Sequence, residues 1–167
     1  MSFKRSRMAR MASALGTILG ALALVLTIPN SAFAAGCSGS GCDDHDPNIQ
    51  TWQSGPVTNY TVQVGGSEFL ELRWGKTDGD QYSWARLEYF SLAPDYHIMI
   101  ERCNSSGTSC TTYLGYTKVG ASGWTAKVAG SSNTYVTRTP MYYNPSTSKA
   151  RACIVKSNGA TTCTPYY

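Results

Sequence analysis

Histidine is scarce in this sequence, and its scarcity limits the metal-binding and catalytic functions that we expect of the protein. The 167 residues include two histidines, His45 and His97, and six cysteines whose spacing does not match that of zinc sites. No serine stands in the Gly-x-Ser-x-Gly pattern that marks the nucleophile of many hydrolases. The even number of cysteines also leaves no unpaired thiol as a nucleophile. We therefore predict no metal ion, no cofactor and no catalytic residues.

Acidic residues are absent from the last part of the chain, and basic residues do not dominate the whole. Four of the 14 basic residues lie in the first ten positions, and the other 10 (14 − 4) balance the 10 acidic residues, which all follow residue 34. A neutral domain lacks the positive surface that nucleic-acid binding requires. Residues 35–102 carry a net charge of −6 (4 basic, 10 acidic), and residues 103–167 carry +6. Because sequence halves commonly interleave in β folds, we expect these charges to mix.

The N-terminal segment has the order of a secretory signal peptide. Lys4, Arg5, Arg7 and Arg10 precede an apolar run over residues 12–28, and Ala32 and Ala34 are the small residues of a cleavage site. The run is short for a membrane anchor and no Arg-Arg pair is present, so we predict general secretion with cleavage after Ala34. Residues 1–34 are then a signal peptide, and the exported protein has no membrane segment. A lipoprotein modified at Cys37 is the alternative, but it would leave an odd number of cysteines.

The six cysteines follow the predicted cleavage site as three close pairs: Cys37 and Cys42, Cys103 and Cys110, Cys153 and Cys163. In an exported chain this pattern predicts disulfides, although six cysteines can pair in many ways. Turn signals support two of these pairs. A two-residue turn at Ser106-Gly107 sets Cys103 opposite Cys110, and a three-residue loop over 157–159 with a left-handed Gly159 sets Cys153 opposite Cys163. Opposed residues on adjacent strands have the Cβ separation that a disulfide needs.

The remaining chain has the composition of short strands separated by turn residues, without sustained helical periodicity. The expected strands are 58–64, 68–74, 82–90, 96–103, 110–119, 124–129, 134–138, 150–156 and 161–164. This pattern predicts an all-β fold after the signal peptide, a small disulfide-stapled antiparallel barrel or sandwich, and favours a partly open barrel. We expect residues 35–51 to form an irregular bridged segment and residues 52–167 a single β domain.

One hairpin register follows from the alternation of apolar and charged residues. Pairing 68–74 with 82–90 so that Glu71 faces Arg86 also sets Leu72 opposite Ala85 and Leu70 opposite Leu87. The hairpin then has one apolar face and one charged face, as a half-buried sheet requires.

Short motifs in the first part of the chain resemble those of a known family. Cys37-Ser38-Gly39-Ser40-Gly41-Cys42, Asp46-Pro47, Leu72-Arg73-Trp74 and Trp84-Ala85-Arg86 occur in that order. The pattern is similar to that of the YjfA-like family of small secreted proteins of Gram-positive bacteria, a family without an assigned function. Its members carry two further cysteines that are missing here, a joint loss expected if those two pair with each other. The resemblance covers about residues 37–90. It implies secretion and a disulfide-bearing β domain, and it brings no catalytic residues.

Two groups of polar residues are candidates for cation binding or catalysis. The carboxylates of Asp43-Asp44-His45-Asp46 could hold a hard cation. The cluster lacks the spacing and glycine of a calcium loop, so we expect a solvated loop with a turn at Asp46-Pro47. Alternation places His97 and Glu101 on one face of their strand, and such a pair could activate a serine. An exposed structural histidine is the simpler interpretation.

Aromatic residues crowd the second half of the chain among Ser, Thr and Gly, a composition typical of adaptable binding surfaces. Some of these rings must fill the core, because aliphatic residues are few there. We predict a binding surface formed by Tyr113, Tyr116, Trp124, Tyr135, Tyr142 and Tyr143. The expected function is that of a monomeric, non-enzymatic protein-binding module, either an adaptor in an extracellular assembly or an inhibitor of a secreted hydrolase. The alternatives are a cell-wall or glycan-binding module and a small secreted toxin or enzyme.

Overall fold

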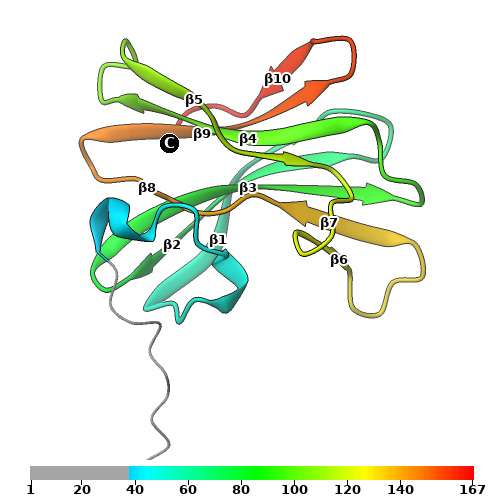
Figure 1. Ribbon diagram of the computed structural model, residues 1–167, viewed down its shortest axis with the longest axis horizontal. Coiled ribbons are helices and arrows are strands. Elements are labelled where there is room, and N and C mark those ends of the chain that lie inside the picture. The colour runs from blue at the N-terminus through cyan, green and yellow to red at the C-terminus, as the bar shows by residue number, and fades with distance from the viewer. Residues whose placement is uncertain (1–37) are drawn as a thin grey trace, which may run out of the picture. The chain divides into compact units, whose positions relative to one another are not determined.

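The computed structural model describes residues 38–167, which form two antiparallel sheets packed face to face (Figure 1). The larger sheet has the order β1 (Ser54–Gln63), β2 (Phe69–Thr77), β3 (Asp80–Phe90), β7 (Thr134–Arg138), β6 (Thr125–Lys127), and β8 (Tyr142–Tyr143) also pairs with β3. The smaller sheet has the order β10 (Thr161–Cys163), β9 (Ser148–Lys156), β4 (Tyr96–Asn104), β5 (Cys110–Lys118). Two 3-10 helices, η1 (Gly39–Cys42) and η2 (Pro47–Ile49), precede the strands. Within the described residues, neither is long and apolar enough to span a bilayer.

The all-β antiparallel fold is confirmed, but the sheets form a sandwich and not the partly open barrel. No strand pairs between the two sheets in the described part of the chain. Bulges interrupt the β1–β2 and β4–β5 ladders, so the edge strands β1 and β5 carry irregularities that discourage further pairing. The core lies between the sheets, where Leu70, Leu72 and Leu87 pack in one cluster with Ile98, Ile100 and Ile154.

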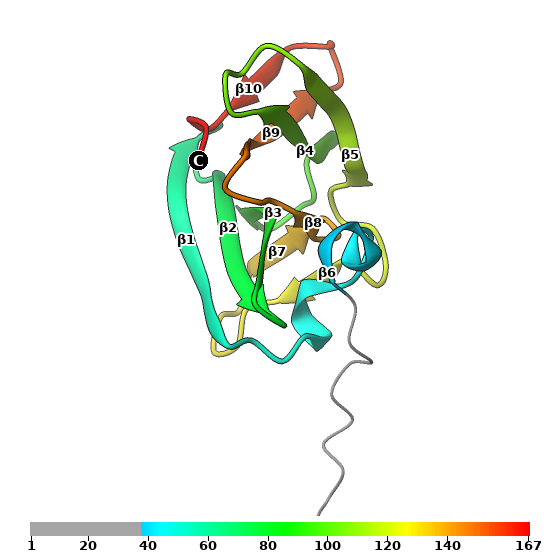
Figure 2. The ribbon, with the colours of Figure 1, turned by 90° about the vertical axis from the view of Figure 1, so that its left-hand side faces the viewer.

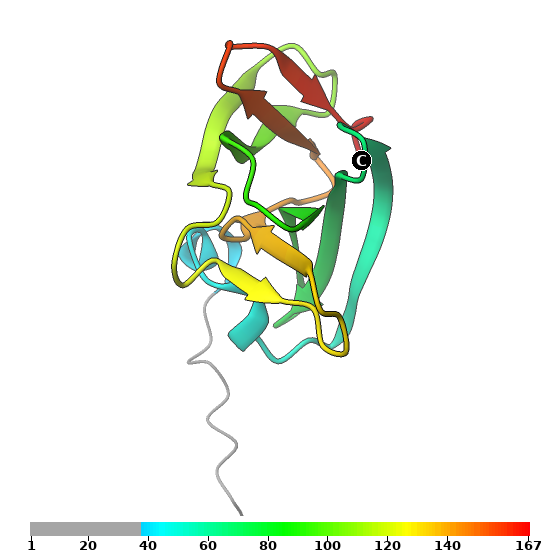
Figure 3. The same cartoon turned by 90° about the vertical axis from the view of Figure 1, so that its right-hand side faces the viewer.

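The two side views show what lies at the margins of the sandwich. The C-terminus lies beside β1 and β2 (Figure 2), where the Tyr167 ring stacks on Trp74 with centroids 6.1 Å apart. Tyr167 also exchanges two backbone hydrogen bonds with Ala150 of β9, at 2.8 and 2.9 Å. On the other side, β6 and β7 form the far edge of the larger sheet (Figure 3). The C-terminal residues therefore link the smaller sheet to β2 of the larger one.

The β2–β3 hairpin has the register that alternation predicted. Glu71 faces Arg86, Leu72 faces Ala85, and Leu70 faces Leu87. The leucines and Ala85 are buried in the core, which leaves the charged residues on the outer face of the sheet.

Both disulfide hairpins form, and one of them has a different turn. Cys153 bonds to Cys163 across the three-residue loop in which Gly159 is left-handed, with φ at 81°. Cys103 bonds to Cys110, but Gly107 N donates to Asn104 O at 2.9 Å, which centres the turn one residue earlier than Ser106-Gly107. The Asn104 side chain accepts from Thr108 N and so favours this longer loop. The cysteines still face each other, whereas Cys37, the predicted partner of Cys42, lies outside the described residues.

The acidic and basic halves of the chain interleave as expected. Strand β4, from the acidic half, lies between β9 and β5 from the basic half. Ion pairs join the halves at Asp46–Arg138 (2.6 Å), Glu101–Arg151 (2.7 Å) and Asp95–Lys118 (3.5 Å). The charge asymmetry of the sequence is therefore largely neutralised within the fold.

The segment 38–53 packs against one end of the outer face of the larger sheet. The Trp52 ring stacks on Trp84 of β3, with centroids 5.1 Å apart and planes 18° apart. Its indole nitrogen donates to Pro47 O at 3.1 Å. Gly75 of β2 lies directly under the ring, and a Cβ atom at this position would come within 2.4 Å of it. The absence of a side chain at Gly75 thus allows Trp52 to cover Trp84.

We predict that Gly75→Ala lowers the free energy of unfolding by about 1–3 kcal/mol, because the added methyl displaces the Trp52 ring. The matched control is Gly66→Ala, where a Cβ atom meets nothing within 4 Å. Urea unfolding followed by tryptophan fluorescence measures both variants. Equal stabilities for the two would show that Trp52 does not need the close approach.

Candidate functional site

The candidate site is the part of the larger sheet's outer face that segment 38–53 leaves uncovered. Alternation along the strands brings together residues that are distant in sequence. Phe69 and Phe90 are 36% and 46% exposed at one end of this area. We call it the open face, and it comprises Thr58, Phe69, Glu71, Arg73, Arg86, Glu88, Phe90 and Val136.

A network of ion pairs holds the charged side chains of the open face in place. Glu71 Oε2 accepts from Arg86 Nη1 at 2.8 Å and from Thr58 Oγ1 at 3.3 Å, and it lies 3.5 Å from Arg73 Nη1. Arg86 also donates to Glu88 at 3.3 Å. Burial lowers the pKa of Arg73, attraction to Glu71 opposes this shift, and repulsion by Arg86 adds to it. The network therefore presents oriented guanidinium groups on a rigid support.

The acidic cluster next to the open face attaches segment 38–53 to the sandwich. Asp43 accepts from the backbone N–H of Tyr143 at 2.6 Å and pairs with Arg102 at 3.4 Å. Asp44 accepts from the hydroxyl of Tyr142, and the backbone of His45 pairs with that of Met141. These carboxylates attach the segment to the sandwich, while Asp44 and His45 remain exposed as expected of a solvated loop. Alternation cannot reveal such partners, because they lie 59 to 100 positions away along the chain.

The strongest of these attachments joins Asp46 to Arg138. Arg138 donates from Nε at 2.7 Å and from Nη2 at 2.6 Å, one bond to each oxygen of Asp46. It also donates to the carbonyls of Gly123 and Trp124 at 3.2 and 3.3 Å. Burial alone would raise the pKa of Asp46, but hydrogen bonds from Arg138 and the amide of Asn48, with attraction to Arg138, hold that pKa below its usual range. The pair thereby fixes η2 at the border of the open face.

A pocket of about 120 Å³ lies where η2 meets the open face. Its polar walls are Arg73, Arg86, Arg138 and Asn48, and its apolar walls are Trp84, Val136, Pro47 and Pro56. The alternation of apolar and charged residues placed Glu71 and Arg86 on a charged face, but it did not show that Arg138, η2 and the two phenylalanines belong to the same site. The signal for the phenylalanines was present, since the alternation that buries Leu70 places Phe69 outside.

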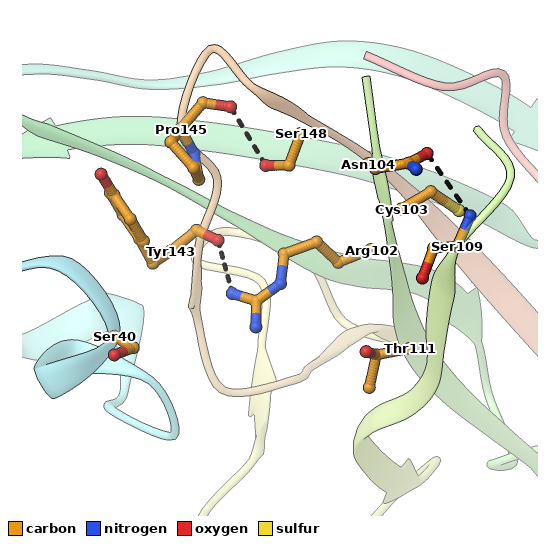
Figure 4. Close-up of a pocket in the computed structure, with 9 residues that line it drawn as sticks. All are labelled: Ser40, Arg102, Cys103, Asn104, Ser109, Thr111, Tyr143, Pro145 and Ser148. Carbon is orange, nitrogen blue, oxygen red and sulfur yellow. Dashed lines mark hydrogen bonds between the residues drawn. The ribbon is translucent and has the colours of Figure 1, made fainter. Parts of the chain in front are cut away.

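A second hollow, of about 270 Å³, lies near the β4–β5 hairpin (Figure 4). The Arg102 side chain extends into it and donates to Tyr143 O at 2.6 Å. Hydroxyl and amide groups line much of the rest: Ser40, Asn104, Ser109, Thr111 and Ser148. Tyr143 and Pro145 also line a neighbouring hollow of about 310 Å³. Tyr143 thus stands between two polar depressions.

The six aromatic residues predicted as a binding surface do not share one surface. Tyr142 is 4% exposed and belongs to the core, and Tyr135 packs on Tyr89 at 5.8 Å. Trp124 lies against Arg138, with the guanidinium 5.5 Å from the ring centre. Tyr143 borders the hollow of Figure 4 and also lines the neighbouring hollow of about 310 Å³. Their side chains alternate between inner and outer faces, because composition does not fix strand register.

Tyr113 and Tyr116 lie together on β5, at the edge of the smaller sheet. Tyr113 is 61% exposed with φ at 61°, an unusual conformation for an aromatic residue, and its ring meets Tyr116 at 5.5 Å. Tyr116 stacks on His97 with centroids 4.3 Å apart and nearly parallel planes. This edge therefore carries a small exposed aromatic group.

The groupings considered for catalysis or metal binding are engaged in other contacts. Glu101 pairs with Arg151 at 2.7 Å and accepts from the hydroxyl of Tyr166, while His97 stacks on Tyr116. Ligand-type atoms of Glu101, Cys103 and Cys110 lie within 4.8 Å of one another, but both sulfurs belong to the disulfide. A sulfur in a disulfide is not the thiolate that binds a metal ion.

No family model, curated protein or solved structure matches this chain. The resemblance to the YjfA-like family therefore stays a prediction. The fold defines the class of protein, a two-sheet antiparallel β sandwich with two disulfide-bonded hairpins. Such bridges are typical of proteins that fold in an oxidising compartment.

We predict that Asp46→Asn lowers the free energy of unfolding by about 2 kcal/mol at neutral pH, because Arg138 loses its charged acceptor. The native pKa of Asp46 lies below the unfolded value of 3.8, so this stabilisation is present above that value and is lost as the pH falls through the native pKa. Urea unfolding at several pH values should show that the difference in free energy of unfolding between the unmodified protein and Asp46→Asn becomes smaller in acid. Asp95→Asn, at a side chain 71% exposed, is the control and should change little. A difference in free energy of unfolding that is unchanged at the lowest pH would contradict the prediction.

Proposed function

We propose that this chain is an exported, non-enzymatic module that binds a protein through the open face. The observation that carries the proposal is the juxtaposition of exposed Phe69 and Phe90 with the Glu71–Arg86–Glu88 network on a flat, uncovered sheet face. Aromatic residues and arginine are the types enriched in protein interfaces, where a few buried rings supply most of the binding free energy. Preorganised charges at the same place would select the partner and speed its association.

The export signal and the disulfides support an extracellular role for this module. The basic, apolar and small-residue order of residues 1–34 predicts cleavage after Ala34, and that part of the chain lies outside the described residues. The Cys103–Cys110 and Cys153–Cys163 bridges staple hairpins of the smaller sheet, so neither of these two bridges lies on the open face of the larger sheet. An adaptor or an inhibitor of a secreted hydrolase fits these features.

We predict that Phe90→Ser and Glu88→Lys each weaken capture of the partner by about tenfold or more. Phe90→Ser removes an exposed aromatic ring from the interface, and Glu88→Lys inverts a charge there. The oxidised protein is fixed on a resin, and proteins retained from the culture supernatant of the producing cells are quantified by mass spectrometry. Tyr113→Ser and Asp95→Lys are the matched controls, because both residues are exposed away from the open face.

The proposal requires a protein that the unmodified chain and both controls retain and that both open-face variants lose. Retention that is equal on all five resins would mean that the contact does not involve the open face. Glu88 is the better residue for charge reversal, because Arg73 is more deeply buried and shares Glu71 with Arg86.

A second candidate function, binding of cell-wall glycan, is favoured by the hollow of Figure 4. Its lining of hydroxyl, amide and guanidinium groups can exchange hydrogen bonds with sugar hydroxyls, and the Tyr143 ring at its border offers an apolar surface to a sugar. The 310 Å³ hollow on the other side of Tyr143 could accept a neighbouring sugar.

We predict for this second function that Tyr143→Ala reduces sedimentation with purified, protein-free cell walls by about tenfold, a loss of roughly 1.4 kcal/mol. Tyr113→Ala is the control at an exposed ring outside the hollow. Circular dichroism checks that both variants stay folded. Undiminished sedimentation of folded Tyr143→Ala would exclude the hollow as the glycan site.

A further inference from the structure

The pocket between η2 and the open face has three arginines on its walls and no carboxylate. Arg73 comes from β2, Arg86 from β3 and Arg138 from β7. The strand register sets Arg86 directly opposite Arg138, an arrangement of like charges that destabilises a sheet unless anions compensate it. Asp46, Glu71 and Glu88 are the compensating acids, and none of them lines the pocket. The cavity itself is therefore surrounded by positive charge.

The three guanidinium groups differ in how many of their hydrogen-bond donors have acceptors. Arg138 donates to Asp46 and to two backbone carbonyls, and Arg86 donates to Glu71 and Glu88. Arg73 lies 3.5 Å from Glu71 and donates weakly to Pro56 O at 3.3 Å, and its Nε is buried without a partner. Arg73 is therefore the guanidinium group whose hydrogen bonds are least complete.

The neighbouring carboxylates do not provide enough acceptors for Arg73 and Arg86. A single oxygen, Glu71 Oε2, serves Arg73, Arg86 and the hydroxyl of Thr58 at 3.5, 2.8 and 3.3 Å. Arg73 and Arg86 therefore repel each other across a shared acceptor. One further anion in the pocket would relieve this repulsion between Arg73 and Arg86.

The apolar walls indicate which anion the pocket accepts. Trp84 is 3% exposed, and Pro47, Pro56 and Val136 complete an apolar rim around the guanidinium groups. A volume of about 120 Å³ accommodates a carboxylate with a short carbon stem. Guanidinium groups match a planar carboxylate geometrically, and a stem contacts the apolar rim, which a bare inorganic anion cannot do.

We propose that the pocket binds a glutamate or aspartate side chain of the protein that docks on the open face. The inference rests on the proposed function, because Arg73, Arg86 and Val136 belong to both the open face and the pocket. The acidic side chain enters beside η2, its carboxylate lies among the guanidinium groups of Arg73, Arg86 and Arg138, and its stem contacts the apolar rim. The pocket thereby determines specificity for a partner with an acidic residue at this place.

The pocket can be tested without any partner protein. The probe is N-acetyl-L-glutamic acid α-amide, which carries a side-chain carboxylate and no terminal one, and N-acetyl-L-glutamine α-amide is the neutral control. NMR of the ¹⁵N-labelled oxidised protein follows the arginine Nε–H signals. We expect a saturable shift of the Arg73 signal in the millimolar range with the glutamate probe alone. Arg151 is an internal control, because its Nε is also buried without a partner but it lies on β9 of the smaller sheet, with its guanidinium over the Tyr166 ring.

Two variants separate the pocket from a general loss of structure. Arg73→Lys keeps the charge but lacks the Nε–H and the planar fork, and Val136→Phe leaves the arginines in place but fills the cavity. We expect each to weaken binding of the glutamate probe at least about tenfold while the remaining spectrum keeps its dispersion. The proposal is overturned if the Arg73 signal does not move, if the glutamine probe shifts it equally, if Arg151 shifts in parallel, or if sulfate binds as tightly as the glutamate probe.

Failure of this inference is distinguishable from failure of the proposed function. If the partner is lost from Phe90→Ser but retained equally by Arg73→Lys and Val136→Phe, the open face binds the partner and the pocket does not. If the glutamate probe binds the pocket but no protein depends on Phe90 and Glu88, the docking function fails and the assignment of a partner side chain to the pocket fails with it.

Discussion

The bidentate pair between Asp46 and Arg138 is the constraint on which the outer face of the larger sheet depends. It joins residues 92 positions apart and holds η2 against β7. Ion pairs at the surface contribute little, but Arg138 is 11% exposed, so its charge would be left without compensation if Asp46 were neutral. With η2 in place, Pro47 and Asn48 wall the arginine pocket and Trp52 reaches Trp84. Together with the attachments of Asp43, Asp44 and His45, this pair determines which part of the face is covered.

The two sheets are stabilised by different means. The Cys103–Cys110 and Cys153–Cys163 bridges lie in the smaller sheet, where each closes a short hairpin. Short loops gain little entropy from a bridge, so these bonds mainly fix strand register. On the larger sheet, side-chain contacts hold segment 38–53 in place, namely the stacked pair Trp52 and Trp84 and the carboxylates of Asp43 and Asp46.

The charges on that face compensate one another imperfectly, and this is the basis of the proposed specificity. Glu71 serves both Arg73 and Arg86 through one oxygen, and one buried Nε is left unpartnered. At a binding face, another molecule can supply the further anion that Arg73 and Arg86 lack while they share Glu71. Phe69 and Phe90 beside it provide the apolar area that a charged cluster alone lacks.

The local sequence pattern was enough to predict the hairpins. It was not enough to predict which residues meet in the candidate site. Alternation with period two set Glu71 opposite Arg86 and Leu70 opposite Leu87, and turn residues set Cys153 opposite Cys163, because these contacts join neighbours in sequence. The choice of a sandwich over a barrel, the burial of Tyr142, and the meeting of Asp46, Arg73 and Arg138 depend on how sheets pack. The sequence by itself determined most of the strands and the two disulfide-bonded hairpins of the smaller sheet, because these depend on contacts between neighbours in the chain. Only the tertiary structure decided which charges face each other, because residues from β2, β3, β7 and η2 meet only after the sheet has assembled.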